Sequence, residues 1–213
     1  MGEFEMKSIV EELILGKVIR GDWVLLEYDP VYPMEGFAWG ILMPALLERG
    51  NVVVADFFGV GDLLFRNYLR RVTGEEYSRA VDLFGRIRVF KIGPGMASYG
   101  EIVEEITPSY DPGAFLRNYH TIVSRMSRLP MKPDYFVTFG LGHYIHFGRD
   151  EALKSLLTAI STIPMEDWVG IHFVNTGVLD GHALSVIEGV TPFVIHLSTE
   201  GIRLRKEGGT VDI

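Results

Sequence analysis

Short runs of consecutive apolar residues alternate along the chain with segments in which apolar residues recur every three or four positions. Each run is too brief for a helix and too continuous for a half-exposed strand, which is typical of buried strands in a parallel sheet. The runs are residues 23–27, 51–55, 135–139 and 168–174, and residues 86–92 are predicted as a further strand of the same series. Residues 101–106 favour a further strand, and 193–197 with 202–206 predict a closing antiparallel hairpin.

Segments of helical spacing occupy the intervals between these strands. An amphipathic helix is expected at the start, with Ile9, Leu13 and Ile14 on its apolar side. The later helices are expected at 35–49, 62–73, 112–129 and 150–161. The inner side of the helix at 62–73 should carry Leu63, Leu64, Tyr68, Leu69 and Val72. Pro44 should kink or shorten its helix, and the glycines at 140, 142 and 148 predict a turn.

This alternation of strands and helices predicts a parallel sheet covered on both faces, in a single three-layer α/β/α domain over residues 1–213. A hydrophobic content of 47% suffices for one such core. Ligands of open α/β sheets bind beyond the carboxyl ends of the strands. Functional residues are therefore expected at 28–36, 56–61, 92–100, 139–148 and 175–182.

The charge balance limits the classes of partner that this protein is expected to bind. A net charge of −8 argues against nucleic acid, and the local strip Arg66, Arg70, Arg71 is more typical of a solvated helix face. The absence of cysteine excludes disulfides, thiolate metal sites and a thiol nucleophile. The first residues do not resemble a signal peptide, and no apolar run is long enough for a membrane span, so we expect a cytoplasmic protein.

Four segments follow one another in a familiar order. Residues 21–30 combine a glycine, a buried strand and a loop with proline, and 36–42 form the start of a helix. Residues 49–56 form a second strand, and 132–139 a lead-in and a later strand. In this order the chain resembles the KaiC and RecA-like P-loop ATPases, and a small uncharacterised family of such domains from hyperthermophilic archaea. The resemblance covers most of the chain and implies a RecA-like fold that ends in a hairpin.

The residues at the nucleotide loop depart from that family's pattern. A phosphate-binding loop needs glycines, a lysine and a hydroxyl group for Mg²⁺. In an ungapped comparison Tyr28 and Pro33 stand at the glycine positions, Met34 at the lysine and Glu35 at the hydroxyl residue. Phe139 stands where the resemblance places the Mg-associated aspartate. We therefore expect no hydrolysis of Mg·ATP, no cofactor and no catalytic residue of the family's kind.

Two carboxylates sharpen this expectation. Glu35 would lie in the first turn of the helix, where it neutralises the positive end that normally meets a phosphate. Asp56 ends the second strand and could serve as a catalytic carboxylate, but a base without a bound phosphate has nothing to activate. Loss of the lysine and Mg²⁺ contacts should cost several kcal/mol of transition-state stabilisation, a rough figure.

Aromatic and apolar residues are expected where a phosphate would bind, and they allow two interpretations. They fill the vacated pocket, or several stay exposed and form a patch that binds a protein or peptide. The residues are Tyr28, Tyr32, Met34, Phe57, Phe58, Phe139, Tyr144 and Phe147. The leading hypothesis is a non-catalytic scaffold whose peptide site includes Tyr28, Tyr32, Met34, Glu35, Asp56, Phe58, Phe139 and Tyr144. Family analogy adds self-association as a corollary.

Two other classes of function remain open. The aromatic rings could stack on a base, which would make the protein a nucleotide or small-ligand sensor without hydrolysis. His143 and His146 could share one side of a helical turn and bind a metal for catalysis, although a zinc site needs a third ligand. His172, His182 and His196 show no ligand spacing, and a structural role for all of these histidines is the more common outcome.

Overall fold

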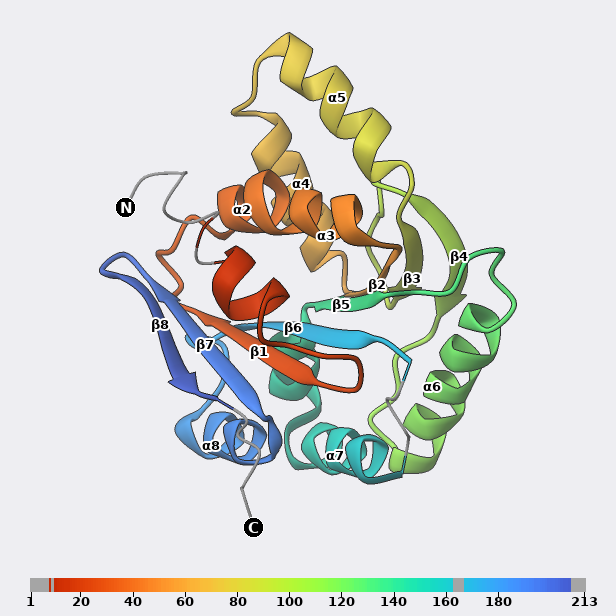
Figure 1. Cartoon of the computed structure of the whole chain (residues 1–213). Helices are drawn as coiled ribbons and strands as arrows, with labels where there is room; N and C mark the ends of the chain where they lie inside the picture. Colours follow the sequence, from red (N-terminus) through yellow and green to blue (C-terminus); the bar gives the residue numbers. More distant parts are fainter. Residues whose placement is uncertain (1–7, 9, 163–166, 208–213) are drawn as a thin grey trace.

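A computed structural model of the chain describes residues 8, 10–162 and 167–207. Its strands form one sheet in the order β4-β3-β2-β5-β6-β1-β7-β8 (Figure 1). Neighbouring strands are parallel except for the final pair, β7 and β8, which is antiparallel. The strands are β1 (Trp23–Tyr28), β2 (Val52–Phe57), β3 (Arg88–Ile92), β4 (Glu101–Ile106), β5 (Tyr135–Phe139), β6 (Val169–Asn175), β7 (Phe193–Ser198) and β8 (Gly201–Lys206).

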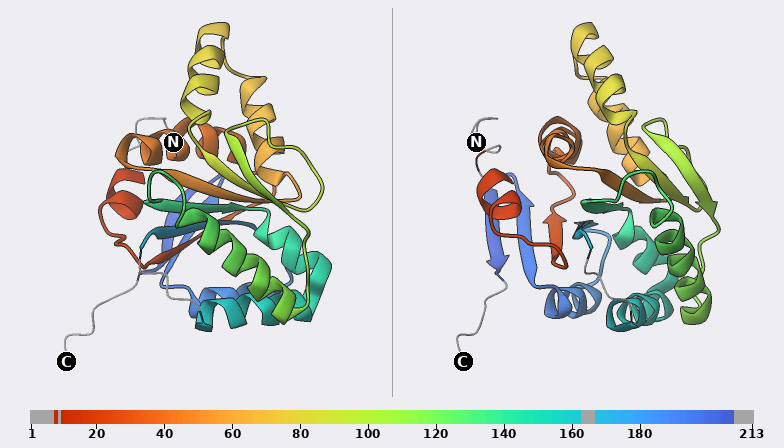
Figure 2. Two further views of the ribbon diagram at one scale, coloured as in Figure 1. Left: turned by 90° about the vertical axis from the view of Figure 1, so that its right-hand side faces the viewer. Right: turned by 45° about the vertical axis from the view of Figure 1, so that its right-hand side comes forward.

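Helices cover both faces of the sheet, so the predicted three-layer arrangement is confirmed (Figure 2). One face carries η1 (Val10–Leu15), α2 (Met34–Phe37), η2 (Ala38–Leu42), α3 (Met43–Arg49) and α4 (Val60–Leu69). The other carries α6 (Pro112–Met126), α7 (Leu141–Thr162) and α8 (Gly181–Val190). We call these layers the α2–α4 layer and the α6–α8 layer. Helix α5 (Gly74–Phe84) extends from the α2–α4 layer and projects from the body of the molecule (Figures 1 and 2).

Each layer encloses its own hydrophobic core against the sheet. Under the α2–α4 layer, Trp39 is fully buried among the rings of Phe65, Phe84, Tyr99 and Phe139. Under the α6–α8 layer, the buried ring of Tyr144 is the centre of a second cluster. Because successive side chains of a strand point to opposite faces, β2 divides its six buried residues between the two cores.

The strands and the C-terminal hairpin agree with the sequence prediction. For the central strands β1, β2, β5 and β6 burial explains why, because a run of mostly apolar residues suits a strand covered on both faces. The helical region at 34–49 is continuous, but residues 38–42 wind as a π-helix immediately before α3. Pro44 lies in the first turn of α3 and has no N–H to donate back into that segment. The irregularity expected from Pro44 therefore takes the form of wider winding. Ile9 of the expected opening helix lies outside the described residues.

The prediction for 62–73 was wrong in its bounds and in part of its inner face, although Leu64, Tyr68 and Leu69 pack against the core as expected. Helix α4 begins at Val60, after Gly59 in the left-handed region with φ 70°, and Leu63 is 52% exposed. The fully buried residues are Gly61, Asp62 and Phe65. The charged Asp62 is held inside by hydrogen bonds. Helix α5 was not predicted, although its capping box of Thr73 and Glu76 is a visible start signal.

The predicted turn at 140–148 is also wrong. Gly140, at φ 76°, makes the turn alone, because a Cβ there would meet the Phe57 carbonyl oxygen at 2.4 Å. Helix α7 starts at the next residue and is broken at Arg149, which has φ 49° and ψ −133°. Helix α8 was missed as well, although Asp180 caps it by accepting a hydrogen bond from the Ala183 amide at 2.8 Å. None of the described helices is both long and apolar enough to cross a membrane.

Candidate functional site

The loop between β1 and α2 stands where the resemblance places a nucleotide loop, and its backbone is bonded internally. The Tyr32 amide donates to the Asp29 carbonyl at 2.9 Å, and the Met34 amide to the Tyr32 carbonyl at 2.7 Å. The Gly36 amide donates to the Pro33 carbonyl at 3.1 Å. A phosphate site needs such N–H groups to point at the ligand. This loop therefore lacks the array of free amides that grips a phosphate.

Side chains occupy the space beside the same loop. Tyr28, Tyr32 and Met34 are 7%, 8% and 1% exposed. Burial raises the pKa of the Tyr28 and Tyr32 hydroxyls above their ordinary values. The edge of Tyr32 faces Phe37, with ring centroids 6.3 Å apart. Met34, at the lysine position of the motif, is part of the core and cannot offer charge to a ligand.

Glu35 forms an ion pair with Arg71, which lies just after the C-terminal end of α4. The Arg71 guanidinium approaches its carboxylate at 2.5 Å, and the Glu35 side chain is 12% exposed. The neighbouring arginines of the predicted basic strip are engaged in the same way: Arg66 pairs with Asp62 at 2.8 Å, and Arg70 donates to Asn67 at 3.2 Å. The strip is thus a partly solvated face whose charges have partners inside the protein.

Asp56 caps helix α4, so the expectation that it lines a ligand site is wrong. Its buried carboxylate accepts hydrogen bonds from the Gly61 amide at 2.8 Å, the Asp62 amide at 3.0 Å and the Tyr99 hydroxyl at 3.0 Å. Burial raises its pKa to about 6, against the opposing effect of these donors. A carboxylate whose oxygens accept three internal hydrogen bonds is a structural group and not a free base.

Phe139 and Tyr144 are fully buried on opposite faces of the sheet. Phe139 stacks on Phe173 with centroids 4.7 Å apart and lies 5.5 Å from Trp39. The Tyr144 hydroxyl donates to the Ser109 carbonyl at 2.7 Å in the other core. The pocket-filling interpretation therefore holds for Tyr28, Tyr32, Met34 and Phe139, and the predicted site residues do not form one continuous surface.

A smaller apolar surface remains at the carboxyl ends of β2 and β3, and we call Phe58, Met96 and Phe147 the aromatic edge. Phe147 is 57% exposed and Met96 is 65% exposed. The rings of Phe58 and Phe147 meet edge to face with centroids 5.5 Å apart. Both phenylalanines belong to the aromatic set expected from the sequence. Met96 was not expected in it, although it follows the Gly93-Pro94-Gly95 breaker in the segment 92–100, where functional residues are expected.

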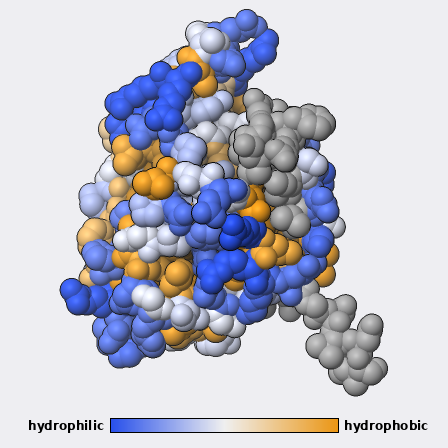
Figure 3. Space-filling model, turned by 90° about the vertical axis from the view of Figure 1, so that its left-hand side faces the viewer, coloured by the Kyte–Doolittle hydropathy of each residue, from blue (hydrophilic) through white to orange (hydrophobic). Residues whose placement is uncertain are grey.

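The backbone beneath the aromatic edge is closely packed. Phe58 adopts φ 59°, which is uncommon for a residue other than glycine. A Cβ on Gly59 would lie 3.3 Å from the Gly95 Cα, so the two loops can approach only without side chains there. Strained residues persist where the surroundings hold them, and they gather at binding sites. The face of the molecule where β7 turns into β8 shows only separate apolar patches between hydrophilic ones (Figure 3).

A buried acidic cluster lies at the end of β1 on the α6–α8 side and was not predicted. Arg205 of β8 pairs with Glu27 at 3.0 Å and with Glu188 at 2.6 Å. His196 lies 3.3 Å from Asp29 and 3.7 Å from Glu27. Burial, and then Glu188, raise the pKa of the fully buried Glu27 to about 7. The cluster ties the C-terminal hairpin to the strand that leads into the β1–α2 loop.

The two histidines of the metal hypothesis lie on the first half of α7. Desolvation and the neighbouring His146 both lower the pKa of His143. Among the residues that the structure describes, no group of three histidine or carboxylate side chains could hold a metal ion. His182 is exposed on α8, and His196 belongs to the acidic cluster.

Comparisons with known proteins define the family and the fold. A family model described as Pyrococcus protein of unknown function, DUF257, matches residues 14–206. The protein PH0250 from Pyrococcus horikoshii is similar with a TM-score of 0.74 and 18% identity, over 92% of each chain. No curated protein sequence matches this chain.

Two further solved structures from Pyrococcus horikoshii support the fold. The KaiC-like protein PH0186 has a TM-score of 0.58 and 18% identity, over 94% of this chain and 86% of its own. The uncharacterised protein PH0321, solved in complex with an unknown peptide, has a TM-score of 0.58 and 14% identity, over 96% and 91%. At these identities the likeness establishes a RecA-like fold, as the sequence predicted.

Proposed function

The chain belongs to the DUF257 family of Pyrococcus proteins, and on that premise we propose a non-catalytic KaiC-like domain that binds a peptide segment of a partner protein. The observation that carries the proposal is the aromatic edge, an exposed apolar surface at the carboxyl edge of the sheet. Ligands of α/β folds bind at that edge. The unknown peptide on PH0321, which shares the fold, makes a peptide the favoured occupant.

Three structural observations support the non-catalytic half of the proposal. The β1–α2 loop bonds its own amides, so it offers little to a phosphate. Met34 and Phe139 are buried in the core, where the family would have a lysine and an aspartate. Asp56 is consumed as a helix cap. The sensor alternative loses support for a related reason, because Tyr28 and Tyr32 have no exposed ring face on which a base could stack.

The peptide half rests on the exposure and rigidity of the aromatic edge. Phe58 and Phe147 support each other edge to face, and the glycine contact beneath Phe58 fixes the loops. Rigid aromatic rings and an adaptable methionine are the residue types that anchor peptides with little loss of entropy. A net charge of −8 favours peptides that carry basic residues around their apolar anchor.

The test is selection from a library of random peptides displayed on phage. The wild-type protein should enrich peptides with an apolar anchor flanked by Lys or Arg. Binding of a selected synthetic peptide should weaken by about tenfold or more in Phe147→Ala, as expected for an anchoring ring. Val31→Ala is the matched control, because Val31 is 76% exposed in the β1–α2 loop, outside the aromatic edge. An unchanged affinity in Phe147→Ala would place the site elsewhere, and a failure to enrich any sequence would remove the peptide hypothesis.

The non-catalytic half has its own test. Thermal unfolding is measured with and without Mg·ATP, Mg·GTP and adenosine at millimolar concentration. A ligand that binds the native state raises the midpoint temperature. It adds roughly 2.7 kcal/mol to the free energy of unfolding when its concentration exceeds Kd about 100-fold. We expect no shift. A shift that requires Mg²⁺ would mean that a phosphate site exists despite the internally bonded loop.

A further inference from the structure

A cavity of about 60 Å³ lies between the sheet and the α6–α8 layer. It is bounded on one side by strands of the sheet, with β2, β5 and β6 among them, and on the other by α6 and α7. Its wall is almost entirely hydrocarbon, supplied by residues such as Ala55, Phe57, Ile122 and Leu156. It is separate from the aromatic edge, since Phe58, Met96 and Phe147 do not line it.

The register of the sheet explains why space is left here. Ala55 of β2 pairs with Thr138 of β5, and Thr138 pairs with His172 of β6. These neighbours form one row across the sheet on the face towards α6 and α7. Ala and Thr are small, whereas the preceding row carries Phe136 of β5 and Trp23 of β1, one on either side of Gly170 of β6. The helices rest on the larger side chains, and the row of small residues is left beneath them.

His172 faces this space without a hydrogen bond. It is 8% exposed, and both of its ring nitrogens lack a partner. The Trp23 ring lies beside it with centroids 4.9 Å apart. Burial lowers the pKa of His172 to about 4, so the ring is neutral at ordinary pH and offers one N–H donor and one nitrogen acceptor. Buried polar groups in native proteins nearly always have a partner, so two unpartnered nitrogens on a cavity wall point to a ligand there.

We propose that this cavity is a binding site for a small uncharged molecule with a hydrocarbon body and one hydroxyl group, which His172 binds by a hydrogen bond. The size of the cavity limits the class of ligand, because an apolar cavity known to bind benzene measures about 150 Å³. A space of about 60 Å³ suits a short-chain alcohol. A water molecule needs two to four polar partners, and this mostly hydrocarbon wall presents few.

Entry is available along α6. The residues of its first half that line the cavity, Phe115, Asn118 and Tyr119, are each only partly buried. The second half, with Ile122 and Met126, is buried against the core. A small ligand can therefore reach His172 past the half-buried side of the helix without separation of the whole layer.

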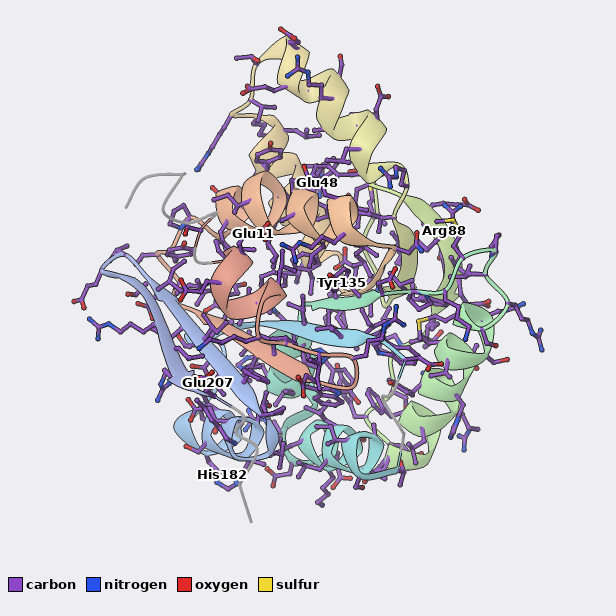
Figure 4. All side chains as sticks on the ribbon, in the orientation of Figure 1. Glu11, Glu48, Arg88, Tyr135, His182 and Glu207 are labelled. Carbon is purple, nitrogen blue, oxygen red and sulfur yellow. The ribbon has the colours of Figure 1, made fainter. Side chains whose placement is uncertain are left out.

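The experiment compares 2-propanol with 2-methylpropane, which differ by the exchange of a hydroxyl for a methyl group. Binding to the full chain is followed by NMR, with the methyl signals of Ala55 and Ile122 as reporters inside the cavity. Both compounds should shift these signals. In His172→Leu the affinity for 2-propanol relative to 2-methylpropane should fall by about tenfold, the effect of one hydrogen bond. The matched control is His182→Leu, because His182 lies on the outer side of α8 (Figure 4) and should leave the ratio unchanged.

Each contrary result is decisive. An unchanged ratio in His172→Leu would show that the imidazole does not hold the hydroxyl group. Reporter signals that respond to neither compound would show that the cavity is not a site. If His172→Leu does not fold, Ala55→Leu fills the same space from β2, two strands away, and should abolish the response of the Ile122 signal to both compounds. Binding that survives in Ala55→Leu would overturn the proposal.

Discussion

Two buried polar side chains, one under each helical layer, are in opposite situations. Under the α2–α4 layer, Asp56 is fully buried and accepts three hydrogen bonds. Under the α6–α8 layer, His172 is almost as deeply buried and has none. A hydrogen-bonded buried group fixes one arrangement of its neighbours. A buried group without a hydrogen bond lowers the stability of the fold, and a ligand that supplies the bond removes this loss. On the side where a nucleotide would bind, Asp56 is thus satisfied within the protein. On the opposite side, His172 remains able to form a hydrogen bond with a ligand.

The difference extends to apolar packing. Trp39 is in contact with four aromatic rings, with centroid distances between 4.5 and 5.5 Å. On the other side, Leu156 borders a cavity. Dense packing gives each atom its full set of contacts, whereas a side chain beside a void has already lost some of them.

The largest expected effect compares the two cores directly. Trp39→Ala should lower the free energy of unfolding by about 4 kcal/mol, because it removes the centre of the aromatic cluster. Leu156→Ala should cost only about 2 kcal/mol, at the low end for such a change, because the side chain lies beside an existing cavity. Urea denaturation of both variants measures the two values. Equal losses would mean that the layers are packed alike.

The acidic cluster predicts a pH dependence of stability. Burial raises the pKa of Glu27 from 4.5 to about 7, so its contribution is fully present below pH 4.5 and is lost as the pH rises to 7. The loss is roughly 3 kcal/mol. Glu27→Gln cannot ionise and should lack this decline, as seen by denaturation at a series of pH values. The matched control Glu75→Gln changes a side chain that is 78% exposed and should retain the wild-type profile.

His172 should act in the opposite direction. Its pKa is lowered from 6.5 to about 4, so its contribution is present above pH 6.5 and is lost as the pH falls to 4. The size is again roughly 3 kcal/mol at most, somewhat reduced if a ligand or water enters. His172→Leu should be more resistant to acid than the wild type, with little change or a gain at pH 7. Greater acid sensitivity in this variant would contradict the assignment of a neutral, unpartnered ring.

The smallest expected effect on stability concerns the aromatic edge. Phe147 is more than half exposed, so Phe147→Ala should change the free energy of unfolding by less than about 1 kcal/mol. The proposed loss of peptide binding would then be separate from folding. A much larger destabilisation would mean that Phe147 is an essential part of the folded core, and a loss of peptide binding in Phe147→Ala could then not be separated from a loss of structure.

Several elements of the fold were predictable from local pattern, and others were not. The buried strands were visible because apolar residues at every position suit burial on both faces. Helix α5 was not predicted, but its start is also a local signal, because Thr73 and Glu76 form a capping box. The start of α7 was hidden, because Gly142 and Gly148 resemble turn residues and are in fact helical. At Gly148 the reason is tertiary: a Cβ would lie 2.1 Å from the Tyr110 ring.

The candidate site likewise has features that were predictable from the sequence and features that were not. Pro33 and Met34 already exclude an ordinary phosphate loop, because a missing N–H and a missing charge are properties of the residues themselves. The exposure of the aromatic residues is not such a property. Tyr144 and Phe147 are three positions apart on one helix, yet Tyr144 is fully buried and Phe147 is 57% exposed.

The sequence alone thus determined the alternation of strands and helices, the closing hairpin and the loss of the phosphate-binding residues, because each follows from a residue and its near neighbours. Only the tertiary structure decided which polar groups are buried and what they meet. Glu27 is joined to Arg205, 178 positions away, and Thr138 is aligned with His172 by the pairing of β5 and β6. Strand order and register set these contacts, and they depend on the packing of the whole chain.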